Sequence, residues 1–77
     1  MPYDFWFNMR RYTSEKSRAT IAELKEMANA TPGYHTCKDM FGKGRDISFG
    51  EGEAVDLTGE PHFYTVPPAT MYRGISD

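Results

Sequence analysis

Apolar and polar residues alternate at the start of the chain, from Tyr3 to Arg11. With the two-residue period of a strand, one side carries Tyr3, Phe5, Phe7 and Met9, and the other carries Asp4, Trp6, Asn8, Arg10 and Tyr12. The first side is apolar enough to enter a core. The second combines Trp, Tyr and Arg, the residue types enriched at binding hot spots. The pattern predicts a strand over 3–11 with one buried face and one face for a partner.

A helical period follows this strand. Ile21, Leu24 and Ala28 form a narrow apolar stripe at helical spacing, and most residues between 17 and 30 favour a helix. Residues 13–15 provide two possible N-cap residues and an acid for the first turn of this helix. The sequence Thr-Pro-Gly at 31–33 favours the end of the helix. We predict one helix over 17–30 that covers a single surface.

After Gly33, strand-like runs alternate with short loops that contain glycine. The runs are 34–41, 45–49, 53–57 and 62–66. Such spacing indicates hairpins and an antiparallel meander. The sequence therefore predicts an α+β fold with the element order β-α-β-β-β-β. In this fold a single helix is packed on one face of a four- to five-stranded, mainly antiparallel sheet. Residues 1–77 form one small domain, in which 67–77 are a partly extended C-terminal tail because Pro67 and Pro68 limit a central strand.

The apolar stripe of the helix should meet the apolar side of the sheet. Besides the first strand, that side should include Ile47, Phe49, Val55 and Leu57. One helix of about fourteen residues cannot cover both faces of such a sheet. The opposite face, with Trp6, must therefore meet solvent, the C-terminal tail or another chain.

Composition narrows the class of protein. Cys37 is the only cysteine, so no intramolecular disulfide can form, and a reducing cytoplasm suits the chain. No apolar run is long enough for a membrane span. The net charge of −2 argues against a general nucleic-acid binder that neutralises phosphates.

Charge is divided unevenly along the chain. Residues 1–45 carry a net charge of +3, and residues 46–77 carry −5. The acids Glu51, Glu53, Asp56 and Glu60 lie close together in sequence, and Phe63, Tyr64 and Tyr72 follow. Aromatic residues mixed with acids suit a partner surface that is basic and partly apolar. Such an acidic surface could also imitate nucleic-acid phosphates in a basic groove.

Two segments contain chemistry-bearing residues. His35, Cys37 and Asp39 share one side of a strand and are metal-ligand or cysteine-nucleophile types, but no recognised spacing supports a site. Packing on a half-buried strand explains them, with Cys37 acting as a small hydrophobe. Gly42-Lys43-Gly44-Arg45 lacks the phosphate-loop pattern and suits a solvated turn. We therefore expect no metal and no cofactor.

These observations favour a non-enzymatic protein-binding module. In size, acidity and scarcity of cysteine the chain resembles phage-encoded inhibitors of host factors or defence systems, anti-CRISPR proteins among them. The expected partner is a host or cellular protein, with a basic groove if the acids dominate, and neither nucleic acid nor a membrane. One binding surface would carry Trp6, Arg10 and Tyr12, and the other Glu51, Glu53, Asp56 and Glu60.

Two alternatives remain open. The chain could be an oligomeric binding protein that sequesters a nucleotide or another small anion through Lys43, Arg45, Arg10 and Arg11. It could also be a small metal- or cysteine-dependent enzyme that uses His35, Cys37 and Asp39. The sequence leaves the oligomeric state undecided, and a homo-oligomer is compatible with it.

Overall fold

The computed structural model describes residues 2–67, and most of the predicted C-terminal tail lies outside them. The elements are β1 (Tyr3–Phe7), β2 (Arg10–Ser14), β3 (Arg18–Thr20), α1 (Ile21–Ala28), β4 (His35–Lys38), β5 (Ile47–Phe49), β6 (Ala54–Asp56) and β7 (His62–Val66). The predicted α+β class, one helix against a mainly antiparallel sheet, is confirmed for the described residues. Three strands precede the helix, however, where the sequence indicated one.

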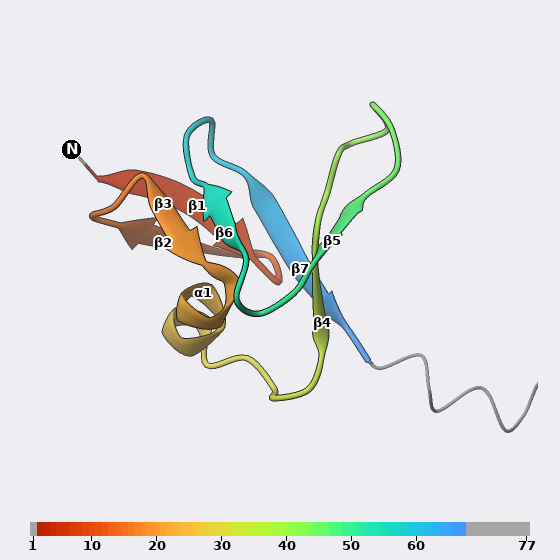
Figure 1. Ribbon diagram of the computed structural model, residues 1–77. Coiled ribbons are helices and arrows are strands. Elements are labelled where there is room, and N and C mark those ends of the chain that lie inside the picture. The colour runs from red at the N-terminus through yellow and green to blue at the C-terminus, as the bar shows by residue number, and fades with distance from the viewer. Residues whose placement is uncertain (1, 68–77) are drawn as a thin grey trace, which may run out of the picture.

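Five strands form the main sheet in the order β2-β1-β7-β4-β5, and β3 pairs with β6 in a second, two-stranded sheet. The strand pairs are antiparallel except β1 and β7, which run parallel. The expected meander is therefore wrong. The last described strand enters the middle of the sheet, between the N-terminal hairpin and β4 (Figure 1).

The first predicted strand is in fact a hairpin. The chain reverses at Asn8 and Met9, whose φ angles of 51° and 70° lie in the left-handed region that a tight two-residue hairpin turn requires. Phe7 is then paired with Arg10, and Phe5 with Tyr12. Met9, expected in the apolar face, is 91% exposed at the tip of the hairpin.

Asn8 also joins the hairpin to the last strand. Its backbone N–H donates to the carbonyl of Phe63 at 3.0 Å. Its side-chain amide donates to the Thr65 hydroxyl at 3.0 Å, and its side-chain carbonyl accepts the Thr65 N–H at 2.9 Å. Asparagine tolerates the left-handed conformation, so this one residue both turns the chain and extends the pairing of β1 with β7.

The helix is shorter than predicted, because it begins at Ile21 and ends at Ala28. Thr20 is its N-cap and forms a capping box with Glu23, so Thr13 and Ser14 do not cap it. Asn29, with φ 54°, ends the helix two residues before the expected Thr-Pro-Gly signal. The residues just before the helix form β3, which pairs with β6.

The core lies between the main sheet and the layer formed by α1, β3 and β6 (Figure 1). Its buried members are Phe5, Phe7, Ala19, Ile21, Leu24, Val55, Leu57 and Phe63. The sequence predicted most of this set, but it assigned Phe63 to a surface patch, and that assignment is wrong. Phe49 is partly buried against the core, whereas Ile47 is 43% exposed.

Candidate functional site

One face of the main sheet has no helix or strand of residues 2–67 packed on it (Figure 1). We call this the open face. Strand register places ten side chains on it, namely Asp4, Trp6, Arg11, Thr13, His35, Cys37, Ser48, His62, Tyr64 and Val66. The face is neither a second core nor a uniformly charged surface, because aromatic, polar and charged groups alternate across all five strands of the sheet.

Three rings form a row along one end of the open face. The indole of Trp6 stacks on the imidazole of His62, with ring centres 5.4 Å apart and planes inclined by 12°. Phe41, from the loop between β4 and β5, meets the same imidazole edge to face at 4.9 Å. We call Trp6, His62 and Phe41 the aromatic row. It brings together residues 56 positions apart in sequence.

Phe41 is held in an unusual conformation. Its φ is 53°, in the left-handed region that bulky residues rarely adopt, and its side chain remains 62% exposed. The carboxylate of Asp39 accepts the Phe41 N–H at 2.8 Å, which holds the turn. Backbone conformations of this kind persist where surrounding contacts hold them, and they are enriched at functional sites.

A small hollow of about 200 Å³ lies beside the aromatic row. Two loops form its walls, residues 38–43 and residues 58–61, and His62 completes it. Glu60, on the second wall, also has a left-handed φ, of 52°. The hollow therefore has a strained, non-glycine residue on each side.

Carboxylates border the aromatic row. Asp4 accepts hydrogen bonds from Thr13 at 2.8 Å and from the Arg11 guanidinium at 2.5 Å, and these two groups lower the pKa of Asp4. Glu60 lies 3.8 Å from the same guanidinium. The Met40 N–H and the Tyr64 hydroxyl lower the pKa of Asp46. Asp4 and Asp46 are consequently ionised at neutral pH.

The predicted grouping of Trp6 with Arg10 and Tyr12 is wrong. The two-residue turn makes odd-numbered residues of β1 face even-numbered residues of β2. Tyr12 therefore lies on the core side and stacks on Phe5 at 5.7 Å, and Arg10 lies opposite Phe7. Arg11, which the sequence did not select for this surface, is the residue opposite Trp6.

Of the four predicted acids, Glu51, Glu53 and Glu60 lie in the loops on either side of β6, and Asp56 is the last residue of β6. Glu53 accepts the Gly50 N–H at 2.6 Å, and Asp56 accepts the Thr58 N–H at 2.9 Å. The backbone carbonyls of Glu51 and Glu53 accept the first N–H groups of α1. Of the four, Glu60 alone is linked to the open face, through Arg11.

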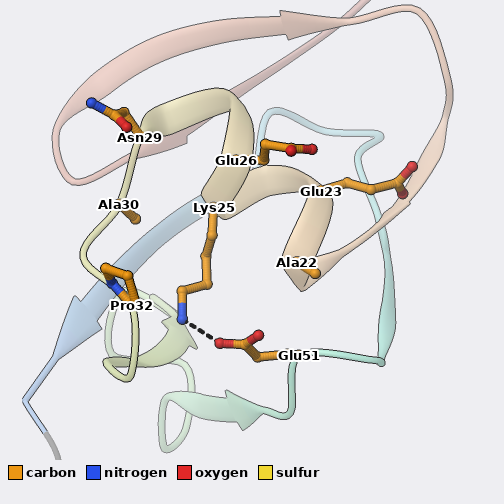
Figure 2. A pocket seen from close by; sticks show the side chains of 8 residues that line it. All are labelled: Ala22, Glu23, Lys25, Glu26, Asn29, Ala30, Pro32 and Glu51. Atoms are coloured by element: carbon orange, nitrogen blue, oxygen red, sulfur yellow. Dashed lines mark hydrogen bonds and ion pairs between the residues drawn. The ribbon is translucent and has the colours of Figure 1, made fainter.

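A larger hollow, of about 400 Å³, lies on the helix side (Figure 2). The Lys25 side chain runs from α1 to Glu51 and is only 8% exposed. Its ammonium donates to the Tyr34 carbonyl at 2.9 Å and to the Glu51 carboxylate at 2.6 Å. The ion pair ties the helix to the loop between β5 and β6, so Glu51 has a structural role.

Replacing Glu51 by alanine should lower the free energy of unfolding by about 1–2 kcal/mol. The substitution leaves a buried ammonium with a single partner, although the exposed carboxylate limits the loss through solvent screening. Glu26 lines the same hollow and is exposed, so Glu26→Ala is the matched control and should change stability by less than about 0.5 kcal/mol. Urea unfolding of both variants measures the difference. Equal losses would contradict the structural role of Glu51.

Acid should destabilise the fold. The pKa values of Asp4, Glu23, Asp46 and Asp56 are all lowered, chiefly by hydrogen bonds from hydroxyl or backbone N–H donors. A carboxylate whose folded pKa lies below its unfolded pKa stabilises the fold above the unfolded value, and the gain is lost as pH falls through the folded value. Urea midpoints should therefore hold above about pH 5 and decline below about pH 4, less steeply in Asp46→Asn. A midpoint that stayed constant down to pH 3 would refute this.

The remaining candidate residues do not gather into a site. His35 and Cys37 lie on the open face, while Asp39 bonds to its own turn. Among residues 2–67, no three His, Cys, Asp or Glu side chains are placed to hold a metal ion. Arg10 and Arg11 point to opposite faces of β2, and Lys43 and Arg45 lie in the loop between β4 and β5. No helix in the described part of the chain is long and apolar enough to cross a membrane.

Sequence reasoning missed Phe41 and His62 as partners of Trp6. His62 and Phe63 are consecutive in β7, so their side chains point to opposite faces of the sheet. Because Phe63 is buried in the core, His62 lies on the open face. Only the parallel pairing of β1 with β7 puts that imidazole beside Trp6.

Comparisons with known proteins provide no assignment: no family model, curated protein or solved structure matches this chain.

Proposed function

We propose that this protein is a non-enzymatic protein-binding module that acts as an inhibitor. In this proposal, the open face docks on a basic, partly apolar surface of a partner protein and blocks that surface sterically. The single observation that carries the proposal is the aromatic row, three rings in mutual contact on a face that no described helix or strand covers, with Phe41 exposed and Trp6 and His62 half-buried.

The aromatic row has the physical properties of a binding hot spot. Trp and Phe offer large apolar areas with few rotatable bonds, so ordering them on binding costs little entropy. The stack on His62 restrains Trp6 further, and the Asp39 turn restrains the backbone of Phe41. Pre-ordered anchors of this kind contribute most of the affinity in protein interfaces.

Charge indicates the chemistry of the partner. Asp4, Asp46 and Glu60 border the open face, and Arg11 is the basic residue that pairs with two of them. The adjoining hollow adds Asp39, Lys38 and Lys43, so four acids stand against three bases and the region keeps a small negative charge. A positive partner surface would be attracted and correctly oriented. A partner that combines Arg or Lys with apolar groups fits both the carboxylates and the exposed rings.

We further propose that the chain is a small phage-type inhibitor of a host factor or defence system, and that it acts in the cytoplasm. Support for this finer proposal comes from the size, the acidity and the single cysteine of the chain. A steric mechanism is sufficient for such an inhibitor, because blocking a surface requires affinity and a complementary shape but no chemical reaction.

Capture from a host lysate tests the proposal. The tagged wild-type chain should retain one protein in stoichiometric amount, and Phe41→Ala should retain much less of it. Met9→Ala is the matched control, because Met9 is also an exposed apolar side chain but lies at the hairpin tip. Retention that is equal for both variants, or lost equally in both, would refute the assignment to the open face.

A further inference from the structure

The strand β5 has one side of its backbone free. It is the outermost strand of the main sheet, and no strand among residues 2–67 pairs with its outer side. Asp39 donates its N–H to the His62 carbonyl, which makes these two residues a hydrogen-bonded pair. Because such pairs alternate along antiparallel strands, Ile47 and Phe49 bond to β4, and the N–H and C=O of Ser48 point outward.

The two edges of the main sheet differ in protection. The β2 edge carries Arg10 and Arg11, and charged side chains of this kind discourage pairing with another chain. The β5 edge consists of Ile47, Ser48 and Phe49, with no charge. Ile47 is 43% exposed beside the partly buried Phe49, so apolar surface remains at this edge.

We propose that the occupant of the β5 edge is a second copy of this chain. The two β5 strands pair antiparallel about a two-fold axis, with Ser48 opposite Ser48 of the partner subunit. This register forms two backbone hydrogen bonds between the serines. It also sets Ile47 against the partner's Phe49, and the reverse, on the core side of the joined sheet.

Charge complementarity supports the second copy over an unrelated strand. Lys43 and Arg45 precede β5 and outnumber Asp46, whose carboxylate accepts hydrogen bonds from the Met40 N–H and the Tyr64 hydroxyl of the same chain. Glu51 and Glu53 follow β5. Antiparallel pairing brings the basic end of one copy beside the acidic end of the other, at both ends of the interface. A parallel arrangement would place like charges together.

The pairing has a consequence for binding. A two-fold axis perpendicular to the sheet leaves both open faces on the same side of the joined sheet. Two aromatic rows then face one direction, which suits a partner that is itself two-fold symmetric and increases affinity through bivalence. The self-association itself does not depend on the proposed function.

Sedimentation equilibrium of the full chain tests the proposal. The interface is short, so we expect the average mass to approach that of a dimer near about 500 µM and to fall toward the monomer near about 10 µM. Ser48→Pro removes the outward N–H without removing a bond to β4, because proline is tolerated at a sheet edge. This variant should weaken self-association about thirtyfold.

Thr13→Pro is the matched control on the opposite edge strand, β2, and should leave self-association unchanged. The double variant Lys43→Glu with Arg45→Glu tests charge complementarity without altering any β5 residue, and should also weaken the dimer. A wild-type chain that remains monomeric at all concentrations would overturn the proposal. So would a dimer that is insensitive to Ser48→Pro or, if that variant fails to fold, to the double charge variant.

Discussion

Phe63→Ala should lower the free energy of unfolding by about 3–5 kcal/mol, the largest loss we expect from any single substitution. Phe63 is 2% exposed, and its ring centre lies 6.4 Å from those of Phe5, Phe7 and Phe49. Removing it therefore leaves a cavity that three other rings border. A domain of this length has about 4–12 kcal/mol of stability in total, so the variant should be partly unfolded at 37 °C.

Urea unfolding followed by circular dichroism measures this loss. Tyr64→Ala, at the next position in β7 but on the open face, is the matched control and should cost much less. The contrast tests which side of β7 faces the core. If the two variants were equally unstable, the assignment of faces in β7 would be incorrect. The placement of His62, and with it the aromatic row, on the open face would then also be incorrect.

Trp6→Ala should weaken binding of the captured partner by at least about 2 kcal/mol, or about thirtyfold in Kd, as expected for a hot-spot tryptophan. The substitution removes the ring that stacks on His62 and exposes that imidazole to water. Since Trp6 is half-buried on the open face and outside the core, the fold should survive. Calorimetric titration measures the affinity, and the urea midpoint checks the fold.

A double-mutant cycle distinguishes an aromatic row from independent contacts. If Trp6 and Phe41 act through their common neighbour His62, the loss from the double alanine variant should differ from the sum of the single losses by at least about 0.5 kcal/mol. Arg10→Ala is a useful control, because it removes a residue that the sequence assigned to the same surface and that the structure places on the other face. A strong effect of Arg10→Ala, with none from Trp6→Ala, would refute our choice of binding face.

The hairpin shows why the candidate surface could be predicted only in part. Reading residues 3–11 as one strand kept the same alternation throughout, so Trp6, Arg10 and Tyr12 fell together. Two-residue hairpin turns more often have the sequence Asn-Gly, and methionine rarely adopts the left-handed φ that Met9 has here. The sequence Asn8-Met9 therefore did not predict a turn. The sequence did contain a signal of the turn. The apolar residues that face the core are odd-numbered before Asn8, whereas Tyr12, after it, is even-numbered.

The pairing of β7 is a second case. Its residues predicted a strand with the observed bounds, His62–Val66, but its place in the sheet was beyond local patterns. Neighbouring strands in sequence usually pair as hairpins, and this preference predicted a meander. Here the backbone groups of β1 that face away from β2 are satisfied by β7 and by Pro61, whose carbonyl accepts the Trp6 N–H at 2.9 Å.

The sequence by itself determined the local elements. Glycine-containing loops delimited most strands, the apolar stripe identified α1, and a single helix implied that one sheet face would not be covered by that helix. Only the tertiary structure decided what that face contains. The periodicity of a single strand predicts which of its residues share a face. Which residues of other strands lie beside them depends on the turns and on the pairing register, which local sequence does not encode. Trp6 was thus foreseeable as an outward-facing residue, whereas its place between His62 and Arg11 follows from long-range pairing.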